Sequence, residues 1–216
     1  MNVATASIAP LPEVLSQPGL NGNGRRHLIG HHDLDPGALR HFNELIAQID
    51  LGHAPLERDQ VASAARELID HRGEGVAPAC IRQRMRRAGA LDLMLTDPEW
   101  ETLALAQVAA AIVVDYLRDS FNLIPNGLPV VGRLDDAVMV ETAWPSAADE
   151  VRNYLDFCRL RRIEAELRGE ERPHFGFTRE TWLVARQAEA EWIAHCRQVA
   201  TNSYLPAGAT QRFRVS

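Results

Sequence analysis

Four aspartates in the middle of the chain have the residue type and spacing of a cation site. Asp115 and Asp119 are four residues apart and share one face if this segment is helical. The loop that follows can bring Asp135 and Asp136 back toward them. Hard cations such as Mg²⁺ and Ca²⁺ bind several oxygen ligands of this kind. One hypothesis is therefore a metal site, and with it a metal-dependent enzyme.

The same aspartates have a structural interpretation, which we favour. Asp135 or Asp136 is well placed to cap the helix that follows. Arg118 and Arg133 are close enough in sequence to pair with neighbouring carboxylates. On this interpretation the acids stabilise the fold and bind no ion.

Histidines and acids also cluster near the N-terminus. His27, His31 and His32 precede Asp33 and Asp35, and imidazole with carboxylate can ligate zinc. The surrounding Gly-rich stretch offers no rigid groups to orient such ligands. We therefore interpret this cluster as a solvated polar segment.

Four arginines lie close together in a helical segment over residues 79–88. They are Arg82, Arg84, Arg86 and Arg87. With the preceding helix they loosely resemble a helix-turn-helix, and arginine on such a helix can contact phosphates and guanine edges. The turn over residues 73–78 is longer than usual, however, and the net charge of the chain is −6. A DNA-binding regulator is the alternative, and a solvated helix face is favoured.

The aromatic residues are best explained by core packing. Trp144, Tyr154, Trp182 and Trp192 all lie in helical patterns. Trp182 and Trp192 share a stripe on the last helix, and that stripe can instead form a protein interface.

The chain carries no catalytic signature. It has no GxSxG, P-loop, Rossmann or HExxH motif. Its three cysteines, Cys80, Cys158 and Cys196, are widely spaced, which argues against disulfides or a zinc knuckle. We therefore expect no catalytic residues and no cofactor.

Composition indicates a globular protein in a reducing cytoplasm. Of the 216 residues, 46% are hydrophobic and 24% are charged. The N-terminus lacks the pattern of a secretory signal. The most apolar stretch, residues 103–114, is too short to span a membrane and is interpreted as a buried core helix.

Periodicity and capping signals predict an all-α bundle of about seven helices with no sheet. Residues 1–34 and 201–216 are predicted to be disordered tails, residues 35–95 an N-terminal helical region, and residues 96–200 a helical core plus a C-terminal helix. Asp35-Pro36 and Asp97-Pro98 both look like a cap followed by proline at the first helical position. Pro145 is expected to separate two helices. The predicted helices span residues 36–51, 55–72, 78–89, 98–120, 135–143, 147–168 and 178–200.

The segment between the central helices, residues 121–133, cannot be helical throughout because of its prolines and glycines. It is nevertheless apolar, so we predict a buried, well-defined corner. The sequence of this segment and of the residues on either side of it resembles the signature of the YkvA-like family of bacterial domains. The residues that carry the resemblance are Tyr116, Asn122, Pro125, Asn126, Pro129, Gly132, Asp135 and Asp136.

The resemblance covers roughly residues 95–165 and implies a helical fold. The family has no established general activity. Asn122 and Asn126 stand where the family usually has Asp. Asn and Asp both bond to their local backbone in turns, so this exchange favours a structural role over cation binding.

We therefore expect a non-enzymatic helical adaptor or regulatory protein that acts through contact with another protein, with self-association as an alternative. Binding of nucleic acid is not favoured.

Overall fold

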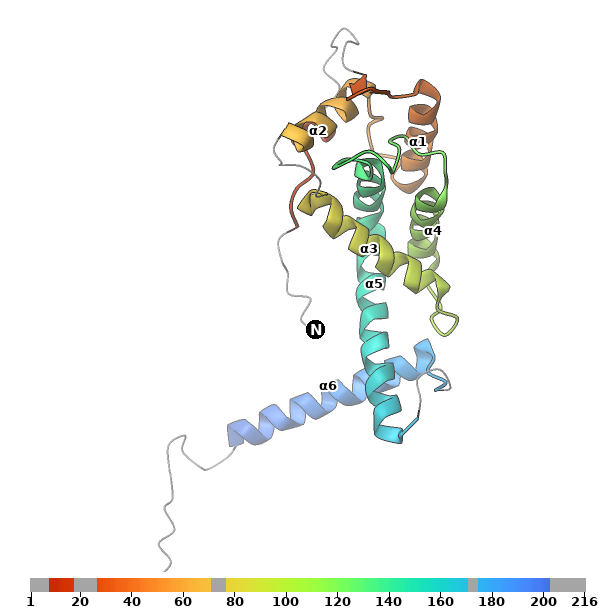
Figure 1. Ribbon diagram of the computed structural model, residues 1–216. Helices are drawn as coiled ribbons and strands as arrows, with labels where there is room; N and C mark the ends of the chain where they lie inside the picture. The colour runs from red at the N-terminus through yellow and green to blue at the C-terminus, as the bar shows by residue number, and fades with distance from the viewer. Residues whose placement is uncertain (1–7, 18–26, 71–76, 171–174, 203–216) are drawn as a thin grey trace, which may run out of the picture. The chain divides into compact units, whose positions relative to one another are not determined.

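The computed structural model describes residues 8–17, 27–70, 77–170 and 175–202. Within them the chain is almost entirely helical (Figure 1). The elements are η1 (Glu13–Leu15), β1 (Leu28–Ile29), β2 (His32–Asp33), α1 (Pro36–Ile49), α2 (Arg58–Asp70), α3 (Ala79–Thr96), α4 (Ala104–Arg118), α5 (Leu134–Arg168) and α6 (Arg179–Asn202). The predicted all-α class is confirmed.

The described part of the chain departs from the prediction of no sheet at one place. β1 and β2 form a small antiparallel hairpin, with Leu28 opposite Asp33 and Ile29 opposite His32. Gly30 makes the turn in the left-handed region, at φ +60°. The hairpin forms because Ile29 and the following Leu34 are both buried against the helices.

Part of the predicted N-terminal tail is packed rather than free. Residues 1–7 and 18–26 lie outside the described residues, but the segment between them contacts α2 and α3. The Gln60 side chain donates to the backbone oxygen of Gln17 at 2.5 Å, and Ala9 N–H donates to the side chain of Gln83 at 2.7 Å. The composition of this segment predicted disorder. Its hydrogen-bond partners lie far along the chain, and such long-range contacts leave no local pattern in the sequence.

Capping signals located some helix ends and misplaced others. Asp35 caps α1 as predicted, since its carboxylate accepts from Ala38 N–H at 2.7 Å. Asp97 does not start a helix. It is the C-cap of α3, its side chain accepts from Glu99 N–H, and α4 begins seven residues later at Ala104. α3 continues this far because Leu91 and Met94 are fully buried.

The predicted break at Pro145 is wrong. α5 runs without interruption from Leu134 to Arg168 with Pro145 inside it. Pro145 and Glu141, the residue whose carbonyl the proline leaves without a helical partner, are both exposed. Water can therefore solvate that carbonyl, and the buried side of the helix is undisturbed.

The chain divides into two compact units, residues 1–154 and 155–216. Residue 95, where the sequence suggested a boundary, instead lies inside α3. In the first unit α1, α3 and α4 surround the beginning of α5, where every residue from Leu134 to Val140 is buried (Figure 1). In the second unit the end of α5 and the start of α6 pack around an aromatic core of Phe157, Phe177 and Trp182.

Candidate functional site

The connection between α4 and α5, residues 119–133, is held by a buried hydrogen-bond network at its ends. The Tyr116 hydroxyl, from the last turn of α4, donates to Asp135 Oδ2 at 2.7 Å. Ile124 N–H donates to the same oxygen at 3.0 Å, and Leu123 N–H donates to the Tyr116 hydroxyl at 3.0 Å. We call residues 116–135, which these bonds hold together, the Tyr116–Asp135 corner. The bonds tie the loop to both helices. Leu123, Ile124 and Val131 are buried, as the sequence predicted, whereas Phe121 is 55% exposed.

Backbone geometry tightens the second half of the corner. Gly132 N–H donates to Leu128 O at 3.0 Å, and a Cβ at position 132 would lie 2.5 Å from Asn126 O, so only glycine fits. Val130 adopts φ +68°, and Val131 N–H donates to Pro129 O at 2.8 Å in a three-residue turn. Positive φ is rare for a β-branched residue and is retained only where the surroundings fix it.

The two motif asparagines have a smaller role than predicted. Neither Asn122 nor Asn126 makes a side-chain hydrogen bond within the described residues, and Asn122 Oδ1 is buried without a partner. The turn is formed by backbone groups, with Leu128 N–H donating to Pro125 O at 3.0 Å. The expected side-chain turn bonds are therefore not formed.

Burial dominates the electrostatics of the corner. Loss of solvation raises the pKa of Asp135, although its hydrogen bonds from Tyr116 and Ile124 oppose that effect. Burial and the neighbouring Asp135 raise the pKa of Asp136 to about 7, and Arg133, whose Nε lies 3.7 Å from Asp136 Oδ2, opposes the rise. The pKa of Tyr116 is raised well above its usual range by burial and by Asp135, so this hydroxyl stays a neutral donor.

The four aspartates do not gather into a cation site. Asp115 and Asp119 are exposed at the end of α4, and the Asp119 side chain accepts from Phe121 N–H at 3.0 Å. Asp135 and Asp136 are fully buried at the start of α5. Across the described segments, no three or more His, Cys, Asp or Glu residues are arranged to hold a metal ion. Asp115 and Asp119 are thus at the surface and Asp135 and Asp136 are in the core, a separation that their spacing in the sequence does not reveal.

The N-terminal histidines also fail to form a metal site. His32 lies in β2 and His31 in the hairpin turn. His27 Nε2 is 4.0 Å from an oxygen of Asp33, and Asp35 caps α1. Each residue is therefore accounted for by the hairpin and the cap.

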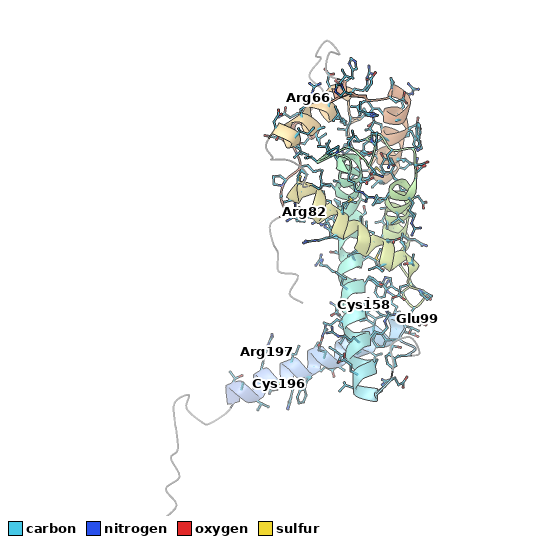
Figure 2. All side chains as sticks on the ribbon, in the orientation of Figure 1. Arg66, Arg82, Glu99, Cys158, Cys196 and Arg197 are labelled. Carbon is cyan, nitrogen blue, oxygen red and sulfur yellow. The ribbon has the colours of Figure 1, made fainter. Side chains whose placement is uncertain are left out.

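The four arginines of α3 point to two different sides of the helix. Arg84 is buried, and it donates to Glu141 Oε2 at 3.0 Å and to the backbone oxygens of Ala9 and Cys80. Arg87 lies beside it, 3.4 Å from the same carboxylate, with its guanidinium 4.0 Å from the centre of the Trp144 ring. Arg82 and Arg86 are exposed, and Figure 2 labels Arg82 on α3.

This division weakens the DNA-binding interpretation. Two of the four proposed contacts, Arg84 and Arg87, stabilise the packing of α3 on α5. The turn that would complete a helix-turn-helix includes residues 71–76, which lie outside the described residues. Arg82 and Arg86 remain available to bind an anion.

The two tryptophans of α6 have opposite environments. Trp182 is 2% exposed, and its indole N–H donates to Asp156 Oδ2 at 2.9 Å. It is a core residue of the second unit and not an interface residue. Trp192 is 66% exposed, and it meets the His195 ring with centroids 6.0 Å apart.

One stripe of α6 explains the difference. Trp182, Ala185 and Glu189 recur at helical spacing along the side of α6 that packs on α5, and Glu189 accepts two hydrogen bonds from Arg159, at 2.5 and 2.7 Å. The stripe continues through Trp192, Cys196 and Val199. Every residue from Ala190 to Thr201 is exposed, and we call this segment outer α6. Figure 2 labels Cys196 and Arg197 on it.

Sequence reasoning missed further apolar residues at the surface. Ile193 is 42% exposed beside Trp192. On α4, Leu105 and Val108 are exposed although Ala106 and Ala109 are buried, so the predicted core helix buries only one side. The alternation of small and large apolar residues along α4 was the available signal.

Cys80, Cys158 and Cys196 form no disulfide with one another. Cys80 is buried, Cys158 is half-buried and Cys196 is exposed. No helix in the described ranges is both long enough and apolar enough to cross a membrane.

Comparisons with known proteins assign this chain to no family. No family model, curated protein or solved structure matches this chain.

Proposed function

We propose that this chain is a non-enzymatic adaptor or regulatory protein that binds another protein through outer α6. The observation that carries the proposal is the apolar stripe of α6, which is interrupted by Glu189 and continues beyond it. Its first half is covered by α5, and its second half, around Trp192 and Val199, is exposed.

Helix stability supports a partner for outer α6. Isolated helices shorter than roughly 12–15 residues are marginal in water, and most helices in proteins are stabilised by packing. Outer α6 receives no such packing from the described residues. A groove that covers Trp192, Ile193 and Val199 would supply it.

The spacing of the exposed anchors fits a known mode of recognition. Trp192, Cys196 and Val199 lie at positions i, i+4 and i+7, which is the pattern of a helix that binds in an apolar groove. Tryptophan is also among the residues that contribute most to binding energy when a partner buries it. The expected partner is therefore a protein with an apolar groove one helix wide.

Retention of partners from a native cell extract tests the proposal. The full chain is compared with the double variant Trp192→Ser/Val199→Ser. Leu51→Ser is the control, because Leu51 is 94% exposed in the loop after α1 and the change removes apolar surface away from α6. We expect one protein to be retained by the wild type and by Leu51→Ser and to be lost with the double variant.

A photo-crosslinker at position 192 identifies that protein directly, with a crosslinker at the exposed Glu180 as the control site. Sedimentation of the purified chain tests whether the partner is a second copy. If the double variant neither loses a retained protein nor changes the oligomeric state, outer α6 is not the binding surface.

We also propose that residues 95–165 form a YkvA-like domain. The support is that Tyr116, Gly132 and Asp135 of the quoted motif converge in one buried corner. An experimental structure of a YkvA-like protein in which these positions are arranged differently would contradict this assignment.

A further inference from the structure

A pocket lies in the first unit between the beginning of α3 and the Tyr116–Asp135 corner. Its volume is about 520 Å³, within the range of sites for small ligands. α3 contributes Ile81, Arg82 and Arg86, and the corner contributes Leu128, Val130 and Arg133. Three arginines therefore gather around apolar walls, and this grouping needs an explanation.

The three guanidinium groups carry little compensating charge. Among the described residues, no aspartate or glutamate lines the pocket. Arg82 donates to the backbone oxygen of Ala77, and Arg86 makes no ion pair or hydrogen bond within the described residues. Arg133 has one carboxylate nearby, Asp136 Oδ2 at 3.7 Å. The other two arginines of α3, by contrast, share Glu141.

Like charges held close together repel one another, and the repulsion is relieved by an anion. Guanidinium groups are also the preferred partners of carboxylates and phosphates, which they bind through paired N–H donors. Within the described residues Arg82 makes one hydrogen bond and Arg86 makes none, so most of their N–H groups can donate to such an anion.

The apolar walls of the pocket indicate that its ligand also has an apolar part. Ile81, Met85, Leu128 and Val130 line the pocket between the arginines. Val130 is held there in the left-handed conformation, φ +68°, by the turn between Pro129 and Val131. Strained residues of this kind cluster at ligand sites. A bare inorganic ion would leave these side chains in contact with water.

We propose that this pocket binds a small amphipathic anion, in which a carboxylate or phosphate group is joined to an apolar body. The anionic group pairs with Arg82 and Arg86, and the apolar body packs on Leu128 and Val130. The site is distinct from outer α6 and does not depend on the proposed function.

Calorimetric titration of the full chain with decanoate, below its micelle-forming concentration, tests the proposal. Decyl phosphate presents the other anionic group, decanol is the uncharged analogue, and inorganic phosphate is the anion without an apolar body. We expect decanoate or decyl phosphate to bind, and decanol and inorganic phosphate to bind at least about tenfold more weakly, because charge-assisted hydrogen bonds and apolar contact are each lost in turn.

The double variant Arg82→Gln/Arg86→Gln is expected to weaken binding about tenfold or more. Arg40→Gln, which removes an exposed arginine from α1, is the matched control and is expected to bind as the wild type does. ¹³C-methyl spectra locate the ligand. The Met85 signal should shift, whereas the signals of Met94 and Met139, which are fully buried, should stay unchanged and report that the variants remain folded.

Three results would overturn the proposal. They are the absence of binding by both amphipathic anions, equal binding by decanol, and equal binding by the double variant. A shift of the Met94 or Met139 signal without one at Met85 would place the ligand elsewhere and would also contradict the assignment.

Discussion

The Tyr116–Asp135 corner and outer α6 both place side chains against their usual preference for the interior or for water, but in opposite ways. In the corner, polar groups are buried and hydrogen-bonded, as for Asp135 and Ile124 N–H. In outer α6, apolar groups such as Trp192 are left exposed. The corner is complete within the chain, whereas the described residues leave outer α6 uncovered. Residues with distinctive sequence patterns can therefore be structural, whereas an ordinary amphipathic helix can carry the function.

The largest contrast is expected between the two tryptophans of α6. Trp182→Ala removes a fully buried ring and the hydrogen bond to Asp156, and should lower the free energy of unfolding of the second unit by about 3–5 kcal/mol. Trp192→Ala should change it by less than about 0.5 kcal/mol, as for other surface substitutions. Urea unfolding followed by circular dichroism measures both. Equal losses would show that the isolated chain covers Trp192.

The next effect is expected in the corner. Asp135→Ala leaves the Tyr116 hydroxyl and Ile124 N–H without their acceptor in a buried place. Each unsatisfied donor costs about 1–3 kcal/mol, and removal of a buried carboxylate offsets part of the loss, so we expect about 2–4 kcal/mol. The ¹³C-methyl signals of Met85, Met94 and Met139 follow unfolding of the first unit.

Two variants sharpen the result in the corner. Asp135→Asn keeps an acceptor oxygen and should cost less than Asp135→Ala. Asp115→Ala alters an exposed aspartate on α4 and should have almost no effect. A loss for Asp115→Ala as large as that for Asp135→Ala would show that the structural interpretation of the corner is wrong.

The first unit is also expected to become more stable as the solution is acidified from pH 8 to pH 5. The native state holds the Asp136 proton up to a pKa of about 7, whereas the unfolded chain releases it near the ordinary value of 3.8. Between these values the native state binds more protons, so the free energy of unfolding falls as the pH rises. The change should be on the order of 1–3 kcal/mol.

Asp136→Asn removes the titrating group without a large change in shape. It should flatten the pH dependence between pH 5 and 8, as measured by urea unfolding at each pH with the methionine methyl signals. A slope that persists unchanged in this variant would assign the dependence to other groups.

Sequence patterns predicted the local parts of this fold better than the tertiary ones. The cap at Asp35 follows from short-range geometry and is as predicted. Asp97-Pro98 carries the same local signal as Asp35-Pro36, yet it ends a helix, because burial of Leu91 and Met94 extends α3 up to it. Pro145 fails as a helix breaker because it faces water.

The candidate sites were harder to predict for the same reason. Arg82 and Arg84 are two residues apart, but one lines a pocket and the other is buried against Glu141. Helical spacing shows that the two arginine side chains point in different directions. It does not show which of these directions faces a neighbouring helix. The stripe of α6 likewise shows an apolar side, but not the residue at which α5 ceases to cover it.

The smallest effect is expected where α6 leaves α5. Arg159 donates to both Glu189 and Asp156, and this pairing holds the pKa of Glu189 below its ordinary value of 4.5. The stabilisation is present above pH 4.5 and is lost as the pH falls and Glu189 takes up a proton. Glu189→Gln should therefore destabilise the second unit by less than about 1 kcal/mol at pH 7, because the pair is partly exposed and screened by solvent. The difference between variant and wild type should vanish on acidification, a trend opposite to that of Asp136. Circular dichroism of the two proteins across the acid range measures this difference, and a gap that widens at low pH would mean that Glu189 acts through packing rather than through its charge.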